Sequence, residues 1–410
     1  MVLLSSYQIS AKWRRLALNR YNAGMSLPAP SPDALAASQA LQRLLADDIA
    51  RHGGAIPFSR FMELALYAPG LGYYSGGAAK LGKDGDFTTA PELTPLFGQA
   101  LAHVAAAIMA QSAPRILEFG AGTGKLARDI LTELASAGVA VERYAIVELS
   151  GELRARQQEM LREFPQVQWL DALPESFDGV VFGNEVLDAM PVDVVTKTEH
   201  GWQSLHVAAE SAADGARFAW SATEAEPALA AQIARQVPEP ADLPVGYVTE
   251  VHGAGCGFMG TLAAMLARGK GAAFLFDYGF PAREFYLGDR ATGTLMCHYR
   301  HHAHAEPFYL PGLQDITAHV DFTAMALAAQ DAGADVLGYM SQAGFLIGAG
   351  IGELLLRTDP ADVMQYLPQA NALQKLLSPA EMGELFKVLV IGRGVELPGQ
   401  LLGSDRSHRL

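Results

Sequence analysis

The sequence predicts an α/β protein whose mostly parallel sheet is covered by helices on both faces. Short apolar segments alternate along the chain with amphipathic segments of helical length, which is the pattern of parallel strands joined by crossover helices. A glycine-rich turn joins one apolar segment to a following helix, and acidic residues end or follow several others. Because parallel strands end at the same edge of their sheet, we expect these features to meet there.

The bulk composition narrows the class of protein. A chain of 410 residues is too long for one ordinary core, so we expect about two or three domains, or one domain with large insertions. The net charge of −14 argues against a nucleic-acid partner, which needs clustered Lys and Arg. Two cysteines cannot build a disulfide framework and favour a reducing compartment. No stretch approaches the roughly 20 apolar residues of a membrane span.

The first 30 residues differ from the rest, because they contain basic residues and no acidic one. The basic residues are Lys12, Arg14, Arg15 and Arg20. This composition fits a mitochondrial transit peptide, or an extension upstream of a true start at Met25. The Ala-rich remainder looks bacterial and favours the second interpretation. We therefore expect a cytoplasmic location if the source is bacterial, with the mitochondrial matrix as the alternative, and leave residues 1–30 out of the fold argument.

Helices and a long glycine-rich loop precede the sheet. Ser31-Pro32 predicts a capped helix that ends near His52, where two glycines follow. A second short helix follows Ser59. The glycine-rich stretch 67–93 contains several aromatic residues, and loops of this length in compact domains are usually functional or disordered. Thr94-Pro95 then caps an apolar helix to about Gln111.

Predicted strands and helices alternate along the core of the chain. The predicted strands are 115–119, 144–147, 167–170, 178–183 and 272–278. The predicted helices are 125–137, 151–164 and 258–268. Alternating segments such as "WQSLHVAA" and "ARFAWSAT" predict β-hairpin material outside the main sheet in an insertion at about 190–256. A second insertion, about 283–333, precedes two final apolar segments, 344–351 and 385–392, which we expect to be C-terminal core strands.

The glycine turn has the sequence "RILEFGAGTGKLARDIL". Its glycines are Gly120, Gly122 and Gly124, and they allow a tight turn and close approach of a ligand to the helix N-terminus. A dinucleotide fingerprint, counted from Gly120, needs a glycine where Lys125 stands, and a P-loop needs Ser or Thr where Leu126 stands. Both phosphate-binding patterns therefore fail.

The remaining pattern, E-x-G-x-G-x-G from Glu118, resembles motif I of class I S-adenosyl-L-methionine (SAM)-dependent methyltransferases. SAM has no phosphate, and a carboxylate suits its positively charged amino-acid end. Glu148 ends the second strand, where an acid can accept hydrogen bonds from ribose hydroxyls. Asp171 follows the third strand and could contact the adenine amine. Each acid alone could be a solvated strand-end residue, but together with the glycine turn they favour a SAM crevice.

Six segments, in order, resemble the MidA-like methyltransferase family over about residues 40–395. They are "LGYYSGGAAKLGKDGDFTTAPELTPLFG", "ILEFGAGTGKL", "IVELS", "GNEVLDAMPVDVV", "FLFDYGF" and "PGLQDITAHVDF". The resemblance implies a class I (Rossmann-like) fold with a mostly parallel seven-stranded sheet, an N-terminal helical segment and an inserted β-containing substrate subdomain. Mitochondrial members support assembly of respiratory complex I and symmetrically dimethylate an arginine of one of its subunits. The resemblance therefore implies a protein substrate carrying an arginine.

This resemblance and the predicted elements suggest an organisation in seven parts. They are a basic extension (1–30), a helical segment with a cofactor-covering loop (31–112), the first part of the SAM-binding core (113–190), an insertion (191–256), the core continued (257–282), a second insertion (283–333) and C-terminal core strands with a tail (334–410).

The resemblance places Asn184 and Glu185 at the end of the fourth strand, beside the reactive methyl group. A carboxylate there would hold a planar guanidinium bidentately and orient one nitrogen toward the methyl. We therefore expect Glu185 to hold the acceptor and Asn184 to bridge cofactor and acceptor. Asp188 is expected to be a second carboxylate or a helix-start acid.

The loop 67–93 is expected to fold over the cofactor as a lid, with Asp86, Thr88 and Thr89 as its polar contacts. The alternative is a tight glycine turn packed by Tyr73 and Phe87. The histidine-rich segment 296–304 lacks a second ligand pair, so we expect no metal. A small-molecule methyltransferase and a non-catalytic SAM-binding assembly factor remain as alternative functions, whereas a nicotinamide dehydrogenase is excluded by the glycine spacing.

Overall fold

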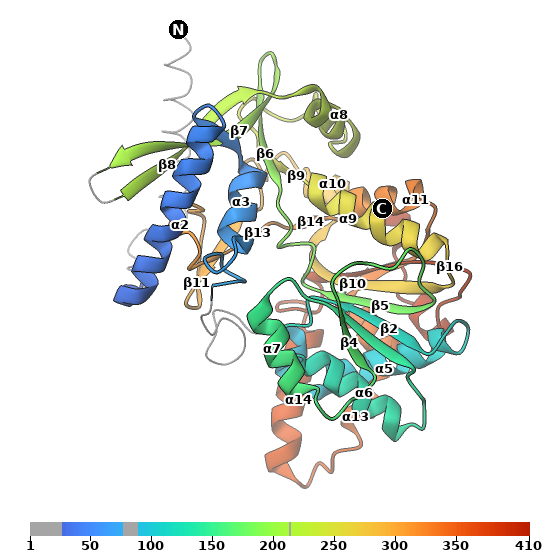
Figure 1. The fold of residues 1–410 in the computed structure, drawn as a ribbon. Coiled ribbons are helices and arrows are strands. Elements are labelled where there is room, and N and C mark those ends of the chain that lie inside the picture. Colours follow the sequence, from blue (N-terminus) through green and yellow to red (C-terminus); the bar gives the residue numbers. More distant parts are fainter. Residues whose placement is uncertain (1–26, 77–88, 213–214) are drawn as a thin grey trace.

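The computed structural model describes residues 27–76, 89–212 and 215–410 (Figure 1). Its largest sheet has eight strands, seven of them in the order β15-β16-β10-β5-β2-β3-β4, with β14 paired to β10. These strands are β2 Arg115–Phe119, β3 Arg143–Val147, β4 Val167–Leu170, β5 Gly179–Asn184, β10 Gly271–Phe280, β14 Val320–Asp321, β15 Asp335–Ser341 and β16 Phe386–Arg393. The predicted α/β class is confirmed, and the described sheet has one strand more than the seven implied by the family resemblance.

The five strands predicted from apolar runs, β2 to β5 and β10, pair in parallel. Strand β16 is antiparallel to both β10 and β15. From β2 the chain moves outward through β3 to β4 and then returns to β5 on the other side of β2. The carboxyl ends of β2 and β5 therefore lie side by side where the strand order reverses, which is the usual position of ligand crevices in open α/β sheets.

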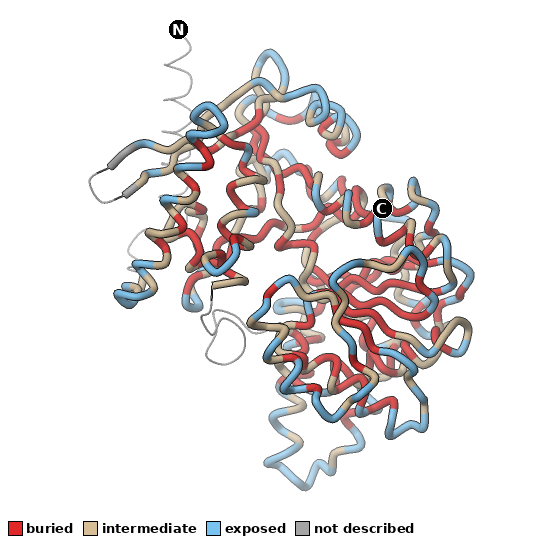
Figure 2. The backbone as a smooth tube through the Cα atoms, viewed as in Figure 1, coloured by how far each residue is buried: buried red, intermediate tan, exposed pale blue. Residues whose placement is uncertain are grey.

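Alternate residues of these strands enter two separate cores, one on each face of the sheet. On β2, for example, Ile116 packs into one hydrophobic cluster and Leu117 into the other. The first face is covered mainly by α5 Pro95–Met109, α6 Lys125–Ser136, α12 Gln342–Gly348, α13 Ile351–Leu355 and α14 Val363–Leu377. The second is covered by α9 Gly253–Ala267 and α11 Phe322–Asp331. Figure 2 shows buried residues along the strands of this sheet.

The three helices predicted before the sheet are present; two have the caps expected from the sequence, whereas α3 (Phe58–Tyr67) begins before Ser59 and has no side-chain cap. Helix α2 (Pro32–Arg51) begins after Ser31, whose hydroxyl accepts a hydrogen bond from the Ala34 amide at 3.2 Å. Helix α5 begins after Thr94, whose hydroxyl accepts one from the Leu96 amide at 3.3 Å. The other short helices are α3 Phe58–Tyr67, α4 Ala90–Leu93, α7 Gly151–Met160, α10 Ala282–Phe285 and α15 Gly399–Leu402.

A second unit is built from segments distant in the sequence (Figure 1). Its five-stranded sheet consists of β1 Ala55–Pro57, β6 Asp193–Thr198, β7 Gly201–Ala212, β8 Gly215–Glu224 and β9 Val248–Val251. β7 and β8 form the hairpin predicted for the insertion. Helices α2 and α3 pack on this sheet in their own hydrophobic cluster. A three-stranded sheet, β11 Met296–Tyr299, β12 His302–His304 and β13 Asp315–Thr317, joins the same cluster. The insertion also contains a helix that was not predicted, α8 Pro227–Gln236.

One predicted strand is wrong. The apolar segment 344–351 forms α12 and the start of α13, and β15, directly before it, is the strand of the sheet. A short apolar run has no period that separates a buried strand from a buried helix. The overlooked feature is Ser341, whose hydroxyl accepts a hydrogen bond from the Gly344 amide at 3.2 Å and caps the helix. In the part of the chain that the structure describes, no helix is long and apolar enough to cross a membrane.

The close approach of β5 to β2 depends on Gly179. Its φ is +133°, and a Cβ there would lie 2.2 Å from the Arg115 carbonyl oxygen. We expect Gly179→Ala to lower the free energy of unfolding by about 2 kcal/mol or more, because both the backbone angle and the contact become unfavourable. Gly257, exposed in the middle of α9 with no atom near its Cβ position, is the control. Gly257→Ala should raise that free energy by ~0.5–1 kcal/mol in the same urea titration. Equal midpoints for both variants would contradict this assignment.

Candidate active site

A cavity of about 730 Å³ opens at the carboxyl ends of β2, β3 and β5. Residues that follow these strands line it, including Gly120, Glu148 and Glu185. The second unit closes it from the other side with Tyr67, at the end of α3, and Asp315, in β13. The cavity therefore lies at the reversal of strand order, between the main sheet and the second unit.

The glycine turn forms one wall of this cavity. Gly120, Gly122 and Gly124 have φ values of 60°, 54° and 87°, in the left-handed region that other residues rarely adopt. Gly120 and Gly122 line the cavity, whereas Gly124 caps α6. This turn therefore needs glycine at all three positions.

Two of the predicted acids lie in this part of the cavity. Glu118 is 2% exposed, accepts a hydrogen bond from the Tyr144 hydroxyl at 2.7 Å, and has its pKa raised to about 7 by burial. Burial also raises the pKa of Glu148. The two oxygens of Glu148 accept hydrogen bonds from the Ser150 amide (2.8 Å) and from the side chain of Gln157 (2.9 Å). Both carboxylates are held in fixed orientations.

Gln157, which the sequence analysis overlooked, ties the glycine turn to Glu148. Its side-chain amide donates to the Gly122 carbonyl (3.0 Å) as well as to Glu148, and its oxygen accepts from the Trp169 indole (2.9 Å). It is fully buried at the inner face of α7. Only its position on that helix face could have indicated this role.

The structure does not bring Asp171 to the cavity. Its side chain is 85% exposed and pairs with Arg154 at 2.6 Å, and it is not among the residues that line the cavity. Three apolar residues line this region instead: Leu149, Leu173 and Phe258. Leu149 is 82% exposed and presents its apolar side chain at the cavity.

The predicted lid is only partly covered by the structure. Asp86, Thr88 and Phe87 lie outside the described residues. Thr89 is described and lines the cavity next to α4. Tyr73 is fully buried in the cluster beneath α3. Of the three proposed lid contacts, only Thr89 can therefore be placed at the cavity.

At the end of β5 the chain turns sharply and presents Asn184, Glu185 and Asp188 to the cavity. Glu185 has φ +53°, a left-handed conformation that is strained for a residue with a side chain. The Asn184 side-chain amide donates to the Glu185 carboxyl group at 3.0 Å. No helix begins at Asp188; a turn leads directly into β6, so the interpretation of this residue as a helix-start acid is wrong.

Burial is the largest influence on the pKa values of Glu185 and Asp188. Burial raises the pKa of Glu185 to about 8, and the charge of Asp188 adds to the shift. Burial raises the pKa of Asp188 to about 6, against a hydrogen bond from the Tyr278 hydroxyl. The buried Oδ1 atoms of Asn184 and Asp188 have no hydrogen-bond partner among the described residues. The site therefore has acceptor atoms and negative charge to offer a ligand.

Aromatic residues that the sequence did not assign close this end of the cavity. Tyr67 and Tyr74 stack with ring centroids 5.5 Å apart. The Tyr74 hydroxyl donates to the Asp315 carboxylate (3.0 and 3.1 Å), and the Tyr67 hydroxyl donates to the Ala189 carbonyl (2.9 Å). His319, noted in a family-like motif, also lines the cavity. These residues come from three chain segments, so no local pattern could have grouped them.

Among the described residues, the charged side chains that line the cavity are all acidic. Its acidic residues are Glu92, Glu118, Glu148, Glu185, Asp188 and Asp315. Two histidines line the cavity, His298 and His319, and burial lowers the pKa of His319 to about 4, so its imidazole is neutral at pH 7. Among the described residues, no Lys or Arg lines the cavity. Nowhere in the described part of the chain do three or more His, Cys, Asp or Glu side chains form a group that could hold a metal ion. The arrangement suits cationic ligands.

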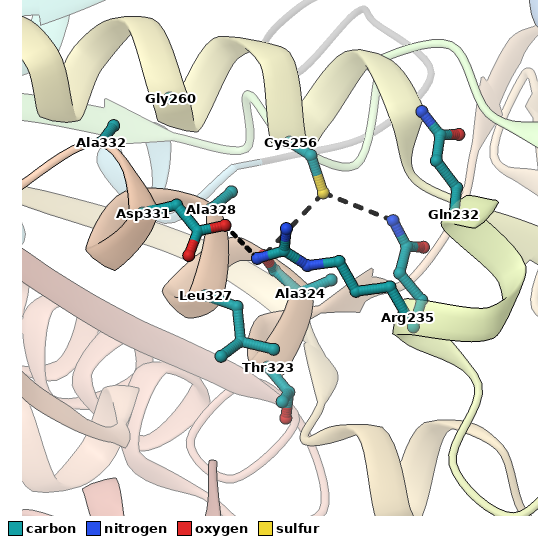
Figure 3. Close-up of a pocket in the computed structure, with 11 residues that line it drawn as sticks. Gln232, Arg235, Cys256, Gly260, Thr323, Ala324, Leu327, Ala328, Asp331 and Ala332 are labelled. Carbon is teal, nitrogen blue, oxygen red and sulfur yellow. Dashed lines mark hydrogen bonds and ion pairs between the residues drawn. The ribbon is translucent and has the colours of Figure 1, made fainter. Parts of the chain in front are cut away.

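A second pocket, of about 380 Å³, lies between α8, α9 and α11 and shares no residue with the acid-lined cavity (Figure 3). Arg235 and Asp331 pair across it. Burial raises the pKa of Cys256 to about 11, so its thiol stays protonated at neutral pH. Because Arg235 is paired with Asp331 and the Cys256 thiol is protonated, this pocket offers neither an unpaired charge nor a nucleophile from these residues.

Comparison with known proteins decides the family. Residues 96–340 match the model of a family described as "Putative S-adenosyl-L-methionine-dependent methyltransferase". The chain belongs to this MidA-like methyltransferase family. A COG1565 superfamily member from Burkholderia thailandensis, solved with S-adenosyl-homocysteine, is 55% identical, with a TM-score of 0.87 over 94% of this chain and 100% of that one.

Curated relatives of this methyltransferase are named for arginine chemistry. "Protein arginine methyltransferase NDUFAF7, mitochondrial" is 29% identical in Danio rerio, over 82% of each chain. The Mus musculus protein of the same name is 29% identical, over 87% of this chain and 84% of that one. The protein is therefore a SAM-dependent methyltransferase, and SAM is its cofactor.

The geometry around Glu148 leads to a test of cofactor binding. We expect Glu148→Ala to raise the dissociation constant of SAM by about 10- to 100-fold, because it removes a charged acceptor held in place by Gln157. Isothermal calorimetry measures this directly. Glu142→Ala is the control, since Glu142 is exposed and pairs with Arg115 away from the cavity. Unchanged affinity in Glu148→Ala would rule out this carboxylate as a cofactor contact.

Proposed function

We propose that the protein transfers the methyl group of SAM to an arginine side chain of another protein. The observation that carries this proposal is the cavity lining, which has six carboxylic acids and, among the described residues, no Lys or Arg. A sulfonium cofactor and a guanidinium acceptor are both cations, and a guanidinium keeps its proton at neutral pH. The names of the curated relatives support the same chemistry.

For the cofactor, we propose that Gly120, Gly122 and Gly124 shape the turn beneath it. Glu118 would face its ammonium group, and Glu148 would accept hydrogen bonds from the ribose hydroxyls. The apolar residues Leu149, Leu173 and Phe258 would hold the adenine. Asp171, the adenine contact expected from the sequence, could do so only if its ion pair with Arg154 broke. Thr89, which lines the cavity, would contact the bound molecule.

For the acceptor, we propose that the Glu185 carboxylate binds the guanidinium bidentately and aims one nitrogen at the methyl carbon. Asp188 would add a second negative charge, and Asn184 would connect acceptor and cofactor. Asp315 and the stacked rings of Tyr67 and Tyr74 would surround the cation. These groups position the reactants, which is the main requirement of an in-line displacement.

The transfer balances with one proton released. The nitrogen forms a bond to the methyl carbon while the carbon–sulfur bond breaks. The electron pair of the broken bond stays on sulfur, so the sulfonium becomes a neutral thioether. The nitrogen then loses a proton to the Glu185 carboxylate, which passes it to solvent. The methylated guanidinium keeps its single positive charge, so the same carboxylates can hold it for a second transfer. We propose symmetric dimethylation of a respiratory complex I subunit or a similar protein, from the family resemblance.

Transfer of labelled methyl from SAM into a cell lysate tests this function. We expect label in a single protein band, released as dimethylarginine on acid hydrolysis. Label in small solutes would instead indicate a small-molecule methyltransferase, and no label an assembly factor that binds SAM without catalysis. Either result would overturn the proposal.

We expect Glu185→Gln to bind SAM normally and to lose at least 100-fold in kcat, because a neutral amide cannot pair with the guanidinium. Calorimetry and single-turnover transfer measure the two properties. Glu175→Gln, at an exposed acid outside the cavity, is the control. Near-normal turnover of Glu185→Gln would remove this residue from the mechanism.

The raised pKa of Glu185 predicts a pH dependence of acceptor use. Below about pH 8 this carboxyl group is increasingly protonated in the free enzyme, so kcat/KM for the acceptor should fall as the pH falls. Bound SAM, a cation, will lower the midpoint of that fall. Asp188→Asn should lower it further, because it removes the like charge that raises the Glu185 pKa. A midpoint that rises in Asp188→Asn would contradict this account.

A further inference from the structure

We propose that Asp277 is a positioning residue that holds the turn of residues 185–188 in the conformation that presents Glu185 and Asp188. Asp277 lies in β10, one residue beyond the pairing of Phe276 with Asn184 of β5. It is fully buried and does not line the cavity. It therefore acts on the acceptor only through the turn. The inference rests on the proposed role of Glu185.

Two of the three hydrogen bonds that the Asp277 side chain accepts come from this turn. Its Oδ2 accepts from the Leu187 amide at 2.9 Å and from the Asp188 amide at 3.2 Å. Its Oδ1 accepts from the Tyr278 amide at 3.0 Å. Two successive amides therefore converge on one carboxyl oxygen, as in a small backbone nest. The two oxygens of the Asp277 carboxyl group supply acceptor sites for all three amides.

The turn needs such an anchor because its backbone is strained. The Glu185 amide still donates to the Phe276 carbonyl at 2.8 Å, which extends the β5–β10 ladder by one residue. Glu185 itself has φ +53°, and left-handed residues other than glycine persist only where their surroundings hold them. The ladder holds the turn before Glu185, and Asp277 holds it after Glu185.

An acidic side chain at position 277 is electrostatically unfavourable. Its presence there therefore suggests a role in function rather than in stability. Asp277 is buried beside two other acids, and burial together with the charges of Asp188 and Glu185 raises its pKa well above the usual range. A buried like-charge cluster destabilises a fold. A cation bound at Glu185 and Asp188 would relieve this repulsion. The position of Asp277 is therefore unfavourable for stability and favourable for presenting the acceptor carboxylates.

Three substitutions and a control test the inference. Asp277→Leu removes every acceptor at similar size, and Asp277→Ser replaces the carboxylate by one shorter hydroxyl if the leucine variant does not fold. Asp277→Asn keeps one oxygen for the Leu187 and Asp188 amides. The control, Asp321→Asn, alters an equally buried acid that also lies in a strand of the main sheet, accepts a backbone amide, from Ala324, and does not line the cavity.

The measurements are crystal structures of the variants and calorimetric affinities for S-adenosyl-homocysteine and for ethylguanidinium added to that complex. In Asp277→Leu or Asp277→Ser we expect Glu185 to leave its positive φ and the ethylguanidinium affinity to fall at least tenfold. The affinity for S-adenosyl-homocysteine should change less than threefold. Asp277→Asn and Asp321→Asn should keep both the φ and the ethylguanidinium affinity within threefold.

The two proposals fail differently. If the leucine or serine variant keeps the positive φ of Glu185, or keeps its ethylguanidinium affinity, Asp277 does not position the turn. If the wild-type protein does not bind ethylguanidinium but the φ of Glu185 still changes with Asp277, the positioning role stands and the arginine acceptor is wrong.

Discussion

Repulsion between buried carboxylates at the carboxyl edge of the main sheet is the interaction on which the rest of the site depends. Glu185, Asp188 and Asp277 lie within one turn and its neighbouring strand, and each has its pKa raised by burial. Such a cluster is unfavourable in an empty cavity and favourable when a cation enters it. This end of the cavity therefore favours a positively charged ligand on electrostatic grounds.

The order of the strands brings this cluster next to the glycine turn that follows β2. β2 and β5 are neighbours although about 60 residues separate them in the chain. The turn after β2 contains glycines with positive φ, and the turn after β5 contains a glutamate with positive φ. The first turn can be relaxed because glycine tolerates that conformation. The second must be held by its surroundings, and the hydrogen bonds from its amides to Asp277 hold it.

The second unit supplies one wall of the cavity next to the turn of residues 185–188. The stacked rings of Tyr67 and Tyr74 and the acid Asp315 come from α3, the segment after it and β13. The hydroxyl of Tyr67 donates a hydrogen bond to the carbonyl of Ala189, directly after that turn. A contact of this kind couples the position of the second unit to the turn that presents the carboxylates.

Local patterns in the sequence determined the strands β2 to β5 and β10, the caps at Ser31 and Thr94, and the glycine turn, because each depends on neighbouring residues and a fixed period. They also placed acids at strand ends, since parallel strands share one edge. Tertiary structure decided which of these acids face the cavity: Glu118 and Glu148 do, whereas Asp171 points outward to Arg154. It alone grouped Gln157, the tyrosines, Asp315 and Asp277 with them. Contacts between distant segments depend on how whole elements pack, and no short-range pattern records that packing.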